Sequence, residues 1–273
     1  TELVNSMFNI VRSELTKAFT LPSVWIIMVL LTAVHLLFQF QSSSINQELV
    51  ANLHDDGTSY VDGVQVIADA SVFTDYVAYI FNPAIFLPLL GAVIAGAEFR
   101  SGQFGMSVLA VPQRMRLFVG KIVAVALHVL ILGMLWIGAA KVLLHLALHG
   151  WEAGWTPSAW SPRFLLADAR ILLFMVTAAL FAYAITLIMR KTLIGVAVAV
   201  VLIMVTMTQL LSLISPAVDA LALFSAARNL VLTGLDVAVP LTGSAVQGAT
   251  VLIGWAVLAC AVAAAAVIRR DAR

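Results

Sequence analysis

The sequence predicts an all-α protein that crosses a membrane several times. Of its 273 residues, 62% are hydrophobic and only 11% are charged, and the mean hydropathy is +1.05. Soluble domains are about half apolar and about a quarter charged. A soluble fold could not bury this much apolar surface, so lipid must surround most of the chain. Helices are expected because lipid cannot satisfy free backbone hydrogen-bonding groups.

Six apolar runs are long enough to approach the roughly 20 residues that a bilayer-spanning helix needs. The first run is short, and the third is long enough to tilt. No internal repeat or linker divides the chain, so 1–273 is predicted to be a single membrane domain. The predicted spans are 24–40, 76–97, 117–146, 164–189, 193–215 and 245–268.

An amphipathic helix is predicted at residues 7–19, before the first span. At 100° per residue, its apolar side chains fill one half of the helical wheel, which is typical of a helix lying on the inner leaflet. Pro22 then ends it. Glu14 falls inside the apolar half, so it needs either a basic partner, for which Arg100 is one candidate, or a place at the interface where it reaches water. The polar half holds Asn9, Arg12, Ser13, Thr16 and Lys17.

The distribution of basic residues predicts the topology. If the N-terminus is inside, the inner segments hold 11 of the 15 basic residues. Lys and Arg favour the cytoplasmic side, so both termini are predicted to be cytoplasmic. The segment between the first two spans holds six acids and no Lys or Arg. It is interpreted either as a solvated hairpin or short helices, or as a region that attracts a cation or substrate.

The sequence offers little for catalysis. Gly91 and Gly96 have the first spacing of a phosphate-binding loop, but Ala97 and Glu98 follow where Lys and a hydroxyl residue are needed. The histidines show no metal-ligand spacing, and the one cysteine, Cys260, cannot form an intrachain disulfide. We therefore expect no enzymatic activity, catalytic residue, metal or cofactor in this chain. A net charge of +1 also argues against a nucleic-acid partner.

The predicted spans contain few charges, so the carboxylates that ion-coupled carriers usually bury are not evident. Near the outer boundary, Lys141 and Asp168 either pair across two helices or reach separately toward the headgroups. Uncharged polar residues suggest a mostly apolar translocation surface with a few hydrogen-bonding groups. The alternative is that they only support helix packing and kinked backbone. These residues are Asn82, Thr206, Thr208, Gln209 and Ser212.

A charged insert, "GAVIAGAEFRSGQFGMSVLAVPQRMRLFVGK" at 91–121, joins the second and third spans. Small residues at its start allow close helix packing. About twenty residues then make a connection for which two to eight would suffice. With "RSELTK" at 12–17, this insert resembles the type-2 ABC permeases, the membrane subunits of ABC exporters. The resemblance rests on Glu98-Phe99-Arg100, Ser101-Gly102, Pro112, Arg114 and Gly120-Lys121, with departures at Gln103 and Gln113.

The resemblance implies that the insert carries a coupling helix, which docks on a separate ATPase subunit. That partner, present in two copies, would bind the ATP and magnesium, and a second identical or homologous permease would complete the assembly. Arg190 and Lys191 would form a second, smaller contact. The residues that would contact or brace the ATPase are Glu98, Arg100, Arg114 and Arg116, with Glu14 close to them.

Export of an amphiphilic or lipid-like cargo is the function that the resemblance implies. Two alternatives remain open at this point. One is a stand-alone channel or ion-coupled carrier, and the other is a membrane scaffold that transports nothing.

Overall fold

The computed structural model describes residues 2–61, 63–100, 113–149 and 158–269. Within these parts, five helical segments are long and apolar enough to cross a membrane. The prediction of an all-α, multi-pass membrane protein is confirmed at this level. The segments are α2 (Pro22–Ala51), α3 with α4 (Ala68–Ala84 and Pro88–Arg100), α6 (Arg114–Ala147), α7 (Pro162–Met189) and α12 (Ala245–Arg269).

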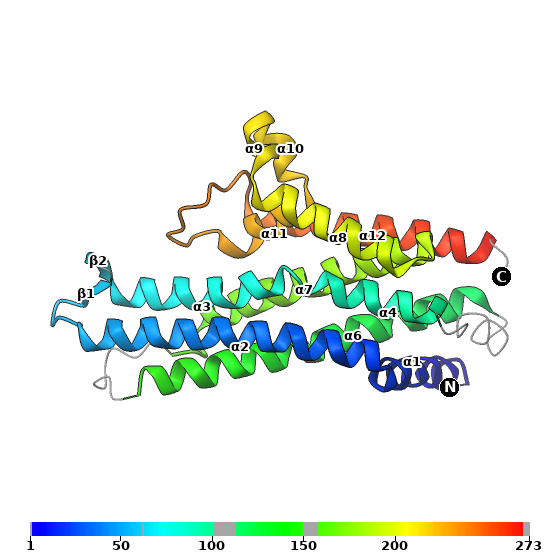
Figure 1. The fold of residues 1–273 in the computed structure, drawn as a ribbon, viewed down its shortest axis with the longest axis horizontal. Coiled ribbons are helices and arrows are strands. Elements are labelled where there is room, and N and C mark those ends of the chain that lie inside the picture. The colour runs from blue at the N-terminus through cyan, green and yellow to red at the C-terminus, as the bar shows by residue number, and fades with distance from the viewer. Residues whose placement is uncertain (1, 62, 101–112, 150–157, 270–273) are drawn as a thin grey trace.

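The long helices lie side by side along the long axis of the molecule (Figure 1). At one end, here called the α1 end, the helix α1 (Glu2–Thr20) lies near the C-terminal end of α12. At the opposite end, the hairpin end, two short strands pair with each other. Helix α7 forms the centre, because it packs against α4, α6, α8 and α12.

The first spanning helix is longer than predicted. The prediction ended it at Phe40 because the following residues are polar, but α2 continues to Ala51. One face of this extension is buried, and the Ser59 hydroxyl donates to the Leu49 carbonyl at 2.8 Å. Earlier in the helix, Gln39 Nε2 donates to the Tyr79 carbonyl of α3 at 2.9 Å. The His35 ring stacks on Trp136. Packing against the rest of the protein therefore stabilises α2 beyond its apolar residues.

A two-stranded antiparallel hairpin follows α2, formed by β1 (Thr58–Val61) and β2 (Val64–Ile67). The structure thus contains the hairpin of the first interpretation of the acidic segment, and attraction of a cation or substrate stays a prediction. Gly57 and Gly63, both with positive φ, lie beside the strands where the chain turns.

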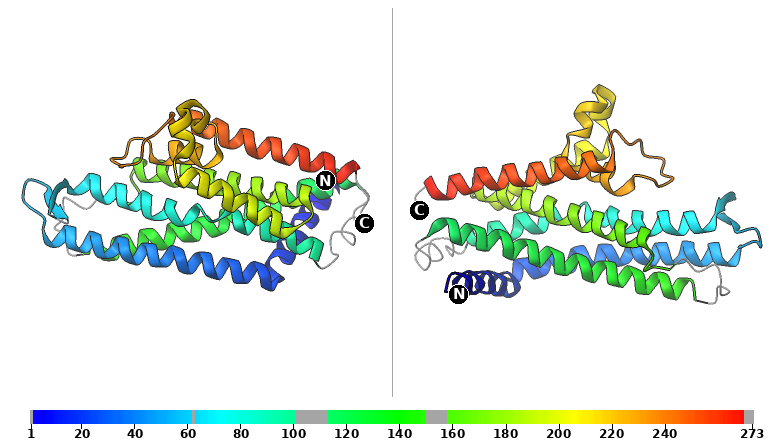
Figure 2. Two further views of the ribbon diagram at one scale, coloured as in Figure 1. Left: turned by 45° about the horizontal axis from the view of Figure 1, so that its top comes forward. Right: turned by 180° about the vertical axis from the view of Figure 1, so that it is seen from behind.

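The prediction of a continuous fifth span at 193–215 is wrong. Helix α8 (Thr192–Met207) has 16 residues, about 24 Å, and Gln209 then takes a left-handed backbone conformation with φ 55°. Thr208 and Ser212 donate their hydroxyls to helix carbonyls around this break. The short helices α9 (Leu210–Ile214) and α10 (Pro216–Ala220) project sideways from the bundle in every view (Figures 1 and 2). Helix α11 (Leu223–Leu232) returns the chain to α12.

Glycines let α4 approach its neighbours closely, as the small residues of 91–96 predict. A Cβ atom on Gly91 would lie 2.2 Å from the Ala179 carbonyl oxygen of α7. A Cβ on Gly96 would overlap Thr192 at the start of α8. Movement of α4 must therefore involve both helices.

We expect Gly91→Ala to lower the free energy of unfolding in mixed micelles by about 1–3 kcal/mol, because the added methyl group meets backbone rather than a flexible side chain. Gly138→Ala in α6 is the matched control, since a Cβ there meets nothing within 4 Å. Equal stability of the two variants would show that α4 and α7 are not packed in this way.

Candidate functional site

Four side chains from four helices meet inside the α1 end, and we call them the α1-end cluster. Lys121 of α6 lies at its centre, with its Nζ 2.8 Å from Glu14 Oε2 of α1 and 2.6 Å from Glu98 Oε2 of α4. Tyr183 of α7 donates its hydroxyl to Glu98 Oε1 at 3.1 Å. The cluster joins segments that are up to 169 positions apart in the sequence, from Glu14 to Tyr183.

The charges of the cluster are buried and balanced. Glu98 is 6% exposed and Lys121 only 2% exposed. Lys17 adds a second ammonium group, with its Nζ 2.7 Å from Glu14 Oε1. Burial by itself would raise the pKa of Glu14, but Lys121 and Lys17 outweigh it and hold that pKa below its ordinary value. Two carboxylates and two ammonium groups thus compensate one another, as buried charges require.

A glycine places α1 against this cluster. Ile10, Glu14 and Ala18 are buried at four-residue intervals, so one face of α1 is turned inward. A Cβ on Gly120 would lie 2.4 Å from Ile10 Cγ2. The absence of a side chain at Gly120 therefore lets α1 approach α6 closely. The next residue, Lys121, supplies the positive charge that pairs with Glu14 of α1.

The cluster also connects the two ends of the predicted coupling segment. Glu98 lies in the last turn of α4, and Lys121 lies in the second turn of α6. The segment 101–112, including the predicted coupling helix, lies outside the described residues, as does the side chain of Arg100. A force on this segment would reach the end of α4 and the start of α6, which the buried Glu98–Lys121 ion pair joins.

The partner of Glu14 differs from the candidate that the sequence suggested. The sequence analysis named Arg100 or exposure to water, whereas the described partners are Lys121 and Lys17. Lys121 appeared only as part of a motif, and Tyr183 was not identified at all. A single sequence gives no signal that would place Tyr183 beside Glu98.

The other predicted contact residues lie around the same end. Arg114 Nη1 donates to the Ile268 carbonyl at 3.1 Å, which ties the start of α6 to the last turn of α12. Arg116 is half-buried. Arg190 ends α7 with φ 53°, and Lys191 beside it is exposed. Because Thr192 packs on Gly96, this turn lies beside the end of α4.

Four of the five predicted translocation residues lie on or beside α8 and α9, with Gln209 at the break between these helices. The hydroxyls of Thr206, Thr208 and Ser212 all donate to carbonyls of their own helical segments, which matches the packing interpretation. Asn82 is exposed on α3, and no hydrogen bond links it to the other four in the described part of the chain. These bonds favour packing for the three hydroxyl residues, and a role in translocation stays a prediction.

A second buried ion pair lies toward the hairpin end. Lys141 Nζ is 2.6 Å from Asp168 Oδ2, and the Tyr76 hydroxyl donates to Asp168 Oδ1 at 2.6 Å. The pairing alternative is therefore the one that the structure contains. This network fastens α3, α6 and α7 together.

A third buried ion pair, Arg228 with Asp219, holds α10 and α11. Ser225 and Thr242 also donate hydroxyls to the Asp219 carboxylate. Asp219 is fully buried and its acceptor oxygens are occupied, so this network is structural.

Comparison of the chain with known protein families and with curated proteins gives no match. Among the described residues, no group of three or more His, Cys, Asp or Glu side chains could hold a metal ion. We take the α1-end cluster as the candidate site, because its buried ion pairs and hydrogen bond join four helices.

We expect Lys121→Met to destabilise the protein by about 3–5 kcal/mol, because two buried carboxylates lose their shared partner. Lys191→Met, an exposed lysine at the same end, is the matched control. The double variant Glu98→Gln/Lys121→Met should recover part of the loss, since one of the unpaired charges is removed. Unfolding in mixed micelles measures all three, and equal stability of the two single variants would contradict the pairing.

Proposed function

We propose that this chain is the permease subunit of an ATP-driven exporter of the type-2 ABC kind. The observation that carries the proposal is the ion pair between Glu98 and Lys121, which joins the helices on either side of 101–112. A partner ATPase docked on that segment would push on α4 and α6 together. Because Glu14 also binds Lys121, α1 would move with them.

The proposed topology places the α1 end in the cytoplasm. Helix α1 lies on the inner leaflet, and the shorter helix α8 supplies the sixth crossing. The basic residues Arg12, Lys17 and Arg114 at this end favour the cytoplasmic side. The start of the chain and the end of α12 lie at the same end of the bundle, which an even number of crossings requires (Figure 1). The membrane proposed is the bacterial plasma membrane.

Motion would pass from the coupling segment into the rest of the bundle through α4. This helix approaches the backbone of α7 at Gly91 and the side chain of Thr192 at Gly96. Such close packing leaves little room for α4 to slide independently. The turn at Arg190 and Lys191 lies beside this contact and forms the proposed second contact with the ATPase.

In the proposed assembly, two permeases and two ATPases work together, and ATP with magnesium binds to the ATPases. This chain contributes the coupling contacts and the path of the cargo. The largely apolar helix surfaces favour an amphiphilic or lipid-like cargo. Asn82 is exposed on these surfaces and would supply a hydrogen-bonding group.

An ion-coupled carrier is the second candidate, because buried carboxylates such as Glu98 are typical of such carriers. Glu98, however, is bound by both Lys121 and Tyr183, which leaves it little freedom to exchange a proton. The coupling function is therefore favoured over proton transport.

Purification from the native membrane in mild detergent tests the proposal. We expect an ATPase to co-purify, and Arg100→Glu to reduce the stimulation of its activity by the permease about tenfold, the factor that corresponds to one lost charge-assisted contact. Arg269→Glu, at the same end on α12, is the charge-matched control and should behave as wild type. Consistent absence of an ATPase, together with transport driven by a proton gradient in vesicles, would favour the carrier instead.

A further inference from the structure

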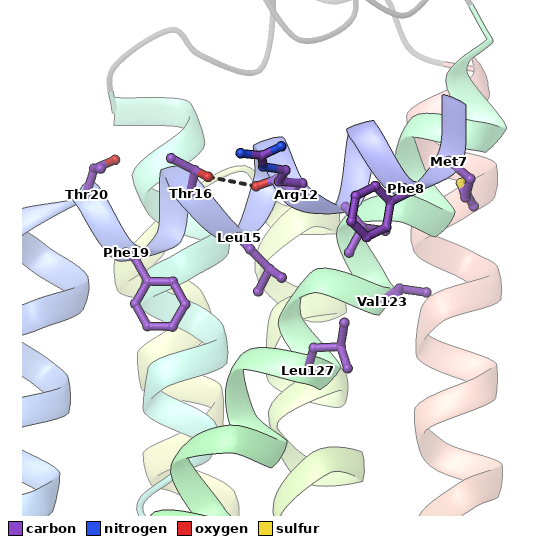
Figure 3. Close-up of a pocket in the computed structure, with 10 residues that line it drawn as sticks. Met7, Phe8, Arg12, Leu15, Thr16, Phe19, Thr20, Val123 and Leu127 are labelled. Atoms are coloured by element: carbon purple, nitrogen blue, oxygen red, sulfur yellow. Dashed lines mark hydrogen bonds between the residues drawn. The ribbon is translucent and has the colours of Figure 1, made fainter. Parts of the chain in front are cut away.

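An apolar groove lies beneath α1, where this helix runs across α6 (Figure 3). Its volume of about 840 Å³ falls within the range of roughly 300–1,000 Å³ that is typical of ligand sites. Leu15 and Phe19 of α1 point down into it, and Val123 and Leu127 of α6 form its wall (Figure 3). The groove is open to the side, on a face of the bundle that is otherwise apolar.

The rim of the groove is polar on one side only. Arg12, Thr16 and Thr20 lie along the upper edge of α1, away from the apolar side chains (Figure 3). Thr16 and Thr20 donate their hydroxyls to carbonyls of α1. Arg12 is the charged residue among those that line the groove. Arg12 is exposed and forms no ion pair with any residue in the described ranges.

An apolar stripe continues from the groove along α6. Val123, Leu127, Ile131 and Leu135 are all exposed and follow one another at four-residue intervals, on one face of the helix. From Val123 to Leu135 the stripe is about 18 Å long. This is close to half of the roughly 30 Å hydrocarbon core of a bilayer, the depth that the acyl chains of one leaflet fill.

We propose that this groove binds one anionic diacyl phospholipid. An acyl chain fills the space between α1 and α6 and follows the stripe along α6, and the phosphate binds the guanidinium of Arg12. The positive charge at the rim and the apolar interior match the two parts of such a lipid. The lipid supports α1 from below, on the side opposite to the cytoplasm in the proposed topology. This inference does not depend on the proposed transport activity.

Native mass spectrometry of the purified protein tests the proposal, with dioleoyl phosphatidylglycerol and dioleoyl phosphatidylcholine as probes. We expect wild type to retain one phosphatidylglycerol more tightly than phosphatidylcholine. Arg12→Gln should weaken phosphatidylglycerol binding about fivefold and remove the preference, because one basic group near a membrane surface contributes about that factor. Val123→Trp should weaken the binding of both lipids by filling the groove.

Two matched controls separate this site from general lipid contact. Arg269→Gln removes another exposed arginine at the α1 end, and Val257→Trp enlarges an exposed valine on α12. Both should bind lipid as wild type does. Equal retention of the two lipids by wild type, or unchanged binding in Arg12→Gln or Val123→Trp, would overturn the proposal. Displacement of the lipid by glycerol 3-phosphate would also overturn it, because the rim would then be a site for free phosphate.

Discussion

The ammonium group of Lys121, held between the carboxylates of Glu14 and Glu98, is the interaction on which the α1 end depends. A buried lysine is stable only with a compensating charge, and each buried glutamate needs a donor in return. This mutual requirement ties the end of α4 to α1 and α6. Tyr183 extends the constraint to α7, the helix at the centre of the bundle.

Two further buried ion pairs join other helices of the protein. Lys141 with Asp168 fastens the helices toward the hairpin end, and Arg228 with Asp219 fastens the projecting helix α10 to α11. Between these points, small residues such as Gly91 allow backbone contact. The α1-end cluster is the one of the three that joins both ends of the predicted coupling segment, which is why we assign coupling to it.

Much of the helical plan follows from hydropathy, because apolar runs of about 20 residues need lipid. The end of α2 could not be predicted in this way, since its polar last turns are stabilised by burial of one face and by the hydrogen bond from Ser59. The break after Met207 depends on the left-handed conformation of Gln209, which no sequence period signals. The apolar position of Glu14 predicted a buried or interfacial acid, but its pairing with Lys121 arises from long-range packing that one sequence does not encode visibly.

Backbone hydrogen exchange tests most directly whether the α1-end cluster makes its helices act as one unit. The account predicts slow exchange in wild type around Glu14 and in the last turns of α4, and a joint loss of protection at both places in Lys121→Met. The Lys141–Asp168 region should remain protected in the same variant. If α1 loses its protection while α4 keeps it, or if neither changes, the two helices are held independently and the central claim is contradicted.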